Sequence, residues 1–332
     1  LSMTLAQYAM ILIIGWQVYN LARNAGMSIA EASGQLALVG LLQFLPLFAL
    51  APFAGLAADR FDRRTIARLT VLLQLGCAAA LTWFTYREAI SLPILFTVAV
   101  ALGVGRAIAG PAFSALAPNL VPKALLPTAI AISTIAWQAG SILGSGLGGY
   151  LYAITPALPY AVSSSLFAIA IVSLTTIGRV PQPAMRKDTR PIGAIVDGLR
   201  YVGRNKMVLG AITLDLLAVF LAGAGALLPV FARDILNVGA DGLGQQAIAS
   251  YIGAMLTAMW FSYRPIKTNV GPKMLGAVLV FGIATNVFAL STSMILSLAM
   301  LFIIGSADMF SVYERLSMIQ LHTPDDKRGR VS

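Results

Sequence analysis

The sequence predicts an all-α fold that crosses a lipid bilayer about ten times. Of the 332 residues, 58% are hydrophobic and only 11% are charged, whereas soluble domains use about 25% charged residues. Long apolar stretches alternate with short segments that carry most of the charges. A spanning helix satisfies its own backbone hydrogen bonds and exposes hydrocarbon to lipid. We therefore expect a polytopic membrane protein.

Each apolar stretch is long enough for a membrane helix, which needs about 20 residues. Glycines interrupt the fourth and fifth stretches, and in lipid such glycines indicate close contact between helices. We expect the helices at about residues 3–22, 35–57, 66–85, 92–117, 128–151, 160–178, 207–229, 245–262, 273–290 and 294–318.

Lysines and arginines concentrate in alternate loops, and the positive-inside rule places such loops in the cytoplasm. The opposite loops carry only three arginines, each with an acid nearby in the sequence: Arg23 with Glu31, Arg87 with Glu88, and Arg233 with Asp234. This asymmetry predicts that both ends of the chain lie near the cytoplasm.

The longest polar segment, residues 179–206, follows six predicted helices and precedes four. We predict that it is a cytoplasmic linker between an N-terminal six-helix bundle, residues 1–178, and a C-terminal bundle, residues 207–332. Transporters are commonly built from repeated halves. A first half of six helices therefore predicts a second half of six, so we expect the C-terminal bundle to be incomplete, with its last two helices missing.

Several classes of function are not expected. The net charge of +10 is spread over loops and not over one folded basic face, which argues against a nucleic-acid partner. One cysteine, Cys77, and one histidine, His322, provide neither a disulfide framework nor a metal site. The sequence has no phosphate-binding glycine loop and no Ser/His/Asp set, so we expect no cofactor and no enzymatic activity.

A turn between the second and third predicted helices carries glycine, an acid and three arginines. Glycine permits close approach of the backbone, and aspartate can pair with an arginine or cap the next helix. These residues, Gly55, Asp59, Arg60, Arg63 and Arg64, resemble the loop motif Gly-x-x-x-Asp-Arg-x-x-Arg-Arg of the major facilitator superfamily. The resemblance implies a conformational latch between two bundles. The alternative is a basic loop that only sets topology.

Arg106 lies inside the fourth predicted helix. A guanidinium at membrane depth costs about 3 kcal/mol on insertion scales unless a cavity or a partner receives it. The segment from Arg106 to Gly110 resembles the Arg-x-x-x-Gly motif of proton-driven drug antiporters, which implies a role in proton coupling. The alternative is an arginine that extends to the membrane surface.

Small residues recur at four-residue spacing in the fifth predicted helix, which favours close packing of two helices. The glycines are Gly140, Gly144, Gly148 and Gly149. They resemble the antiporter motif that ends Gly-Pro-x-x-Gly-Gly, although Ser145 stands at the position of the proline. Helix packing without any role in antiport is the alternative.

Two acids in the C-terminal half are candidates for binding the coupled proton, since desolvated carboxyl groups in a bilayer tend to face a cavity. They are Asp215 in the seventh predicted helix and Asp308 in the tenth. A helix cap or a hydrogen bond between helices is the alternative for Asp215. We expect Glu314 and Arg315 to form a structural ion pair.

Polar and aromatic side chains within the predicted helices are candidates for lining a substrate cavity. Hydrogen bonding between helices is the alternative role for such side chains. The candidates are Gln17, Tyr19, Asn20, Gln43, Trp137, Gln138 and Asn286.

Residues 228–236 and 323–332, together with the loop motif, resemble the bacterial branch of the superfamily that contains the enterobactin exporter and macrolide-efflux-like proteins. The resemblance implies proton-coupled export of a siderophore or hydrophobic drug by alternating access. It also implies a monomer in lipid, located in the bacterial inner membrane. A metal-ion exporter of this branch is one alternative, and a membrane scaffold or enzyme without transport is another.

Overall fold

The computed structural model describes residues 1–60, 62–116, 122, 125–176, 209–210, 213, 224–264 and 270–322. These residues form helices joined by turns, and no strand occurs among them. Eight helical segments within these ranges are long and apolar enough to cross a membrane. The predicted all-α, polytopic membrane fold is therefore confirmed.

The first six helices each contain one of these candidate spans. They are α1 (Ser2–Asn24), α2 (Ile29–Arg60), α3 (Arg63–Tyr86), α4 (Leu92–Leu116), α5 (Leu126–Ile154) and α6 (Leu158–Thr176).

Helix α2 begins at Ile29, earlier than the hydropathy pattern indicates. The reason is a capping box formed by Ser28 and Glu31. The backbone N–H of Ser28 donates to the Glu31 carboxylate at 2.8 Å, and the backbone N–H of Glu31 donates to the Ser28 hydroxyl at 3.3 Å. These bonds satisfy N–H groups that the first turn leaves without an intrahelical acceptor.

The second part of the chain has a less regular start. The predicted helix at 207–229 lies mostly outside the described residues. The described residues after it form short elements, followed by three long helices. They are the 3₁₀ turn η3 (Ala224–Leu227), α9 (Leu228–Val230), the π-helical turn η4 (Phe231–Ile235), α10 (Gly239–Tyr263), α11 (Val270–Leu290) and α12 (Met294–His322).

The chain divides into two compact units. The described part of unit 1 includes α1 to α6 and residues 226–245, and that of unit 2 includes a few residues before 226, α10 from Gln246 onward, α11 and α12. The predicted linker at 179–206 lies outside the described residues, so the predicted bundle boundaries stay a prediction.

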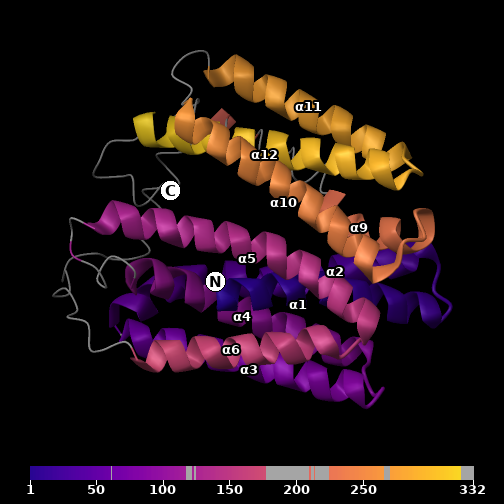
Figure 1. Ribbon diagram of the computed structural model, residues 1–332. Coiled ribbons are helices and arrows are strands. Elements are labelled where there is room, and N and C mark those ends of the chain that lie inside the picture. The colour runs from indigo at the N-terminus through magenta and orange to yellow at the C-terminus, as the bar shows by residue number, and fades with distance from the viewer. Residues whose placement is uncertain are drawn as a thin grey trace. The chain divides into compact units, whose positions relative to one another are not determined.

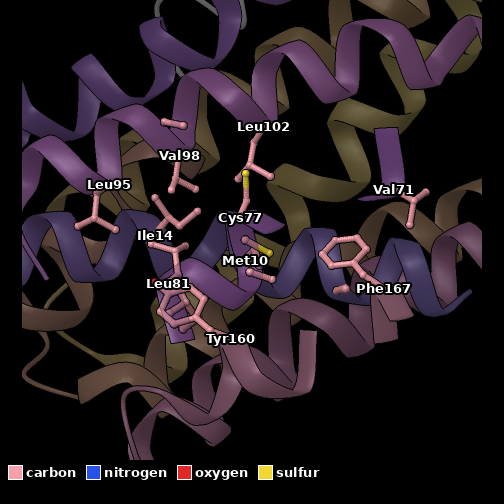
Figure 2. Packing of buried hydrophobic residues seen from close by; sticks show 14 of the residues in the cluster. Met10, Ile14, Val71, Cys77, Leu81, Leu95, Val98, Leu102, Tyr160 and Phe167 are labelled. Carbon is pink, nitrogen blue, oxygen red and sulfur yellow. The ribbon is translucent and has the colours of Figure 1, made fainter. Parts of the chain in front are cut away.

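Helix α1 is central to unit 1 and contacts α2, α5 and α6, while α3 and α6 run side by side (Figure 1). Figure 2 shows the resulting core, in which Met10 and Ile14 of α1 pack among side chains from α3, α4 and α6. Leu81, Leu95 and Tyr160 are fully buried there. Dispersion contacts in such a close-packed core hold the helices together where lipid already surrounds them.

Glycines set the distance between α5 and α1. A Cβ added at Gly140 would lie 2.7 Å from the Cβ of Thr4, and one at Gly148 would lie 3.1 Å from the Cα of Ala9. A Cβ at Gly144 would meet the carbonyl oxygen of Leu5. The backbones of the two helices therefore touch along this stripe.

Three further glycines allow close approaches of helices, one in unit 1 and two in unit 2. In unit 1, a Cβ at Gly149 would lie 2.9 Å from the Cα of Gly244 at the start of α10. In unit 2, Gly305 of α12 faces the carbonyl of Ser250 on α10, and Gly253 of α10 faces the carbonyl of Phe302 on α12. Helices α10 and α12 consequently pack backbone to backbone.

Candidate functional site

Arg106 lies within the candidate span Leu92–Gly110 of α4, and its side chain is exposed on the surface of unit 1. Its Nη1 donates to the Oε1 of Gln43 on α2 at 3.5 Å. Gly103, one turn earlier on α4, permits this arrangement because its missing Cβ would lie 2.5 Å from the Gln43 carbonyl oxygen. Among the described residues Arg106 has no carboxylate partner.

An aromatic pair from two other helices is linked to this arginine through Tyr8. The charge of Arg106 acts on the hydroxyl of Tyr8 on α1. The ring of Tyr8 meets that of Trp137 on α5 edge to face, with centroids 6.1 Å apart. We call Tyr8, Gln43, Arg106 and Trp137 the Arg106 surface. Four helices thus bring one cation, one amide and two aromatic rings to one side of the bundle.

The Arg106 surface suits a ligand that is partly aromatic and partly polar. A guanidinium within a spanning segment requires a water-filled cavity or a polar partner. Among the described residues, the hydrogen bond that Arg106 donates to the neutral Gln43 amide uses only one of its five N–H donors. A guanidinium near an aromatic pair can bind an oxygen-rich or aromatic organic molecule.

A second polar group joins the C-terminal end of α1 to η4. Arg23 donates from Nη2 to the Oδ1 of Asp234 at 3.1 Å and from Nε to Oδ2 at 3.2 Å. The hydroxyl of Tyr19 also donates to Oδ2 of Asp234. This carboxylate, 14% exposed, therefore accepts hydrogen bonds from two residues of one helix.

Arg233 of η4 adds hydrogen bonds that it donates to residues of α1. Its Nη1 donates to the backbone oxygen of Asn20 at 3.1 Å and to the side-chain oxygen of the same residue. Its Nη2 donates to the side-chain oxygen of Asn24 at 2.7 Å. We call Tyr19, Asn20, Arg23, Asn24, Arg233 and Asp234 the α1–η4 network.

The electrostatics of the network favour the charged form of Asp234. Burial raises the pKa of its carboxyl group, but hydrogen bonds from Tyr19 and Arg23 and the charges of Arg23 and Arg233 outweigh it, so the pKa lies below its ordinary value. The sequence places an acid near each of these arginines, yet the contacts differ. Arg23 binds Asp234 and not Glu31, while Arg233 binds α1 and not its neighbour Asp234.

Several residues that were predicted to line a substrate cavity are not part of the Arg106 surface. Gln17 is 3% exposed, accepts a hydrogen bond from Tyr160 at 2.7 Å and donates to Thr85 at 3.2 Å. Asn286 is exposed on α11, and its amide donates to the carbonyl of Gly282 in the same helix at 2.8 Å. Gln138 is half-buried on α5. Of the predicted set, the Arg106 surface contains only Gln43 and Trp137.

The loop motif is described only in part. The side chains of Gly55, Asp59 and Arg60 lie outside the described part of the chain. Arg63 is the first residue of α3. Asp62, which the sequence analysis did not single out, caps this helix by accepting a hydrogen bond from the backbone N–H of Arg64 at 3.0 Å. An acid just before a predicted helix was the available signal.

The acids of the C-terminal half also have different surroundings. Asp215 lies outside the described residues. Asp308 is exposed on α12. Glu314 of the same helix is buried, and neither of its carboxylate oxygens has a hydrogen-bond partner, which does not match the predicted ion pair with Arg315. No group of three or more His, Cys, Asp or Glu side chains suited to a metal ion occurs in the described ranges.

Comparison with known proteins identifies relatives along most of the chain. The family profile described as Major Facilitator Superfamily matches residues 1–332. Multidrug efflux pump Tap of Mycolicibacterium fortuitum is 25% identical over 313 residues, which cover 89% of this chain and 74% of Tap. Enterobactin exporter EntS of Escherichia coli O1:K1 is 24% identical over 283 residues, which cover 84% of this chain and 67% of EntS. 

The fold is also shared with a solved structure. The D-xylose-proton symporter superposes with a TM-score of 0.70 at 15% identity, covering 99% of this chain and 84% of that chain. The chain spans about two thirds of the length of several of its curated relatives, such as 64% of Tap from Mycobacterium tuberculosis.

Proposed function

Because the chain belongs to the Major Facilitator Superfamily, we propose that it is a proton-coupled exporter of a small organic molecule that works by alternating access. The family and the named relatives indicate a transporter and not an enzyme. Two of these relatives are named as exporters, one for multiple drugs and one for the siderophore enterobactin. We propose a siderophore or a hydrophobic drug as the substrate class.

The Arg106 surface is the observation that carries this proposal. Among the described residues, it combines a guanidinium that has one neutral hydrogen-bond partner with an aromatic pair, and the guanidinium belongs to a candidate membrane span. Transporters of this architecture bind their substrates near the bilayer midplane, where polar groups are retained only for function. Arg106 is therefore proposed to bind substrate or to take part in proton coupling, together with the candidate acids Asp215 and Asp308.

Alternating access needs a closure that can form and open at each face of the membrane. We propose that the α1–η4 network closes the outer face, because it ties the end of α1 to η4 through charge-assisted hydrogen bonds. On the inner face, the proposed latch consists of Gly55, Asp59, Arg60, Arg63 and Arg64. This assignment places the basic loops in the cytoplasm, as the positive-inside rule requires.

Cellular accumulation tests the proposal with two probes, ethidium as a hydrophobic drug and enterobactin as a siderophore. Cells that express the protein should retain less of at least one probe than cells without it. Arg106→Ala should restore retention, and Arg106→Lys should restore it partly because lysine keeps the charge but not the planar set of donors. The matched control is Arg87→Ala, since the Arg87 guanidinium lies over the exposed ring of Trp83, 5.0 Å from its centroid.

Equal protein levels in the membrane are verified by immunoblot for every variant. If neither probe is exported by the unmodified protein, or if Arg106→Ala exports as well as Arg87→Ala, the proposed role of the Arg106 surface is wrong.

A further inference from the structure

The buried face of helix α12 carries a carboxyl group. Its buried positions Ile304, Ala307, Ser311 and Glu314 recur every three or four residues, which places them on one side of the helix. The side chain of Glu314 is 1% exposed. Both of its carboxylate oxygens are buried without a hydrogen-bond partner.

Aromatic rings surround the helix turn that carries Glu314. Phe261 of α10 stacks on Tyr313 with centroids 4.4 Å apart, and it meets Phe310 at 4.9 Å. Phe310 also lines an apolar cavity of about 360 Å³ between α10, α11 and α12. The acid therefore lies at the end of an apolar interface that offers it no polar contact in the described part of unit 2.

Three cationic side chains belong to the same end of unit 2. The charge of Lys273 on α11 acts on Glu314 without a hydrogen bond to it. The Arg264 guanidinium, at the end of α10, lies over Trp260, 5.5 Å from the centroid of its ring. Arg315 follows Glu314 in α12 and has an interaction of its own. Within the described ranges, the acid consequently has a cation in electrostatic range but no hydrogen-bonded partner.

A carboxylate in this position is costly. Removing an ionised carboxylate from water without a partner costs several kcal/mol, and such a group binds a proton instead of remaining charged. The protonated carboxyl group has no net charge to desolvate. Its proton leaves readily only when water or a cation reaches the oxygens.

We propose that Glu314 is a proton-binding site of this protein, occupied by a proton in the present conformation and emptied when α10 and α12 move apart at this end. The carboxylate gains one proton to become a carboxylic acid and releases the same proton to water. Lys273 then stabilises the carboxylate that remains. The proposal rests on proton-coupled transport as the function, and it adds a site to the candidates Asp215, Asp308 and Arg106.

Asp308 provides the comparison on the same helix. It lies six residues before Glu314 and is exposed, whereas Glu314 is buried. The two acids thus differ in access to solvent while sharing one helix. A residue that merely stabilises α12 would not link its protonation to transport, so both protonation and pH-driven transport are measured.

Infrared difference spectroscopy on the purified protein in lipid nanodiscs measures this directly. Raising the pH should remove a C=O band of a protonated carboxylic acid. One component of this band should be absent in Glu314→Gln and retained in Asp308→Asn. A band that is the same in Glu314→Gln as in the unmodified protein, or no such band in the unmodified protein, overturns the assignment.

Transport then separates this proposal from the proposed function. In proteoliposomes, Glu314→Gln should lose uphill transport driven by a pH gradient but keep exchange of labelled for unlabelled substrate, and Glu314→Asp should recover part of the uphill transport. Full uphill transport by Glu314→Gln contradicts the proposal. If the unmodified protein transports neither probe, the proposed function fails, while the infrared band still decides whether Glu314 binds a proton.

Discussion

Arg23 and Asp234 lie 211 positions apart in the chain, yet the Arg23 guanidinium contacts both carboxylate oxygens of Asp234, the shorter contact being 3.1 Å. This pair connects the end of α1 to η4, and Tyr19 adds a third donor to the same carboxylate. Charge-assisted hydrogen bonds of this kind hold the end of α1 against η4 until water molecules replace the protein partners.

Breaking the pair should open the end of the protein that it closes. Asp234→Asn removes the charge that Arg23 binds, so a cysteine placed at Gln43 should react severalfold faster with a membrane-impermeant thiol reagent added from outside. The background carries Cys77→Ser, which removes the only native thiol. Glu31→Gln is the control, because Glu31 contacts Ser28 and not the network. Equal rates for the two variants would show that the pair does not control access.

The closure should be insensitive to pH in the neutral range. The pKa of Asp234 is lowered in the closed state, so its stabilising charge is fully present above the ordinary aspartate pKa of about 4. The stabilisation is lost only as the pH falls through the lowered pKa. The labelling rate at Gln43→Cys is divided by the rate of the same cysteine in the Asp234→Asn variant at each pH, so that the pH dependence of the thiolate cancels. This ratio should stay constant from about pH 8 to 5 and rise only under stronger acid. A steady rise of the ratio across the neutral range would assign the closure to another group.

The contact between α5 and α1 should not tolerate a side chain at its centre. Gly144→Val should lower the melting temperature in detergent by several degrees, because the new Cβ meets the backbone oxygen of Leu5. Gly76→Ala on α3 is the matched control, since nothing lies within 4 Å of its missing Cβ. That control should melt at the same temperature or slightly higher. Comparable losses in both variants would mean that helix packing does not explain the glycines of α5.

The buried bond between Tyr160 and Gln17 should matter for stability more than for transport. Tyr160→Phe leaves the Gln17 oxygen without its donor at 2.7 Å, which should cost about 1–3 kcal/mol in the free energy of unfolding. Adding Gln17→Leu should recover part of that loss, because both polar partners are then gone. Unfolding by denaturant in mixed micelles measures both changes. A large loss of transport with unchanged stability would instead support the predicted role of Gln17 in lining the substrate cavity.

Hydropathy predicted the membrane helices of α1 to α6 well, because the length of an apolar stretch is set by bilayer thickness. The start of α2 was predicted too late because a hydropathy pattern ignores the polar capping box of Ser28 and Glu31. The pairing of Arg23 with Asp234 was not predictable, since no local periodicity encodes contacts between segments so far apart.

The surroundings of Asp308 and Glu314 were not predictable for a different reason. In a soluble helix, the apolar stripe marks the buried face. In a membrane, both the lipid-facing and the protein-facing sides are apolar, so the pattern does not show which acid of α12 is buried. The Arg106 surface was predicted in part, as Arg106, Gln43 and Trp137, whereas Tyr8 resembled any aromatic residue of a membrane helix.

Proton-driven transport is the central claim, and flux in proteoliposomes tests it most directly. Movement of whichever probe the cells export, ethidium or enterobactin, should follow an imposed pH gradient and fall to the rate of empty liposomes when nigericin collapses that gradient. Arg106→Ala should remove the gradient-driven part. Transport at one rate with and without the gradient would contradict the account.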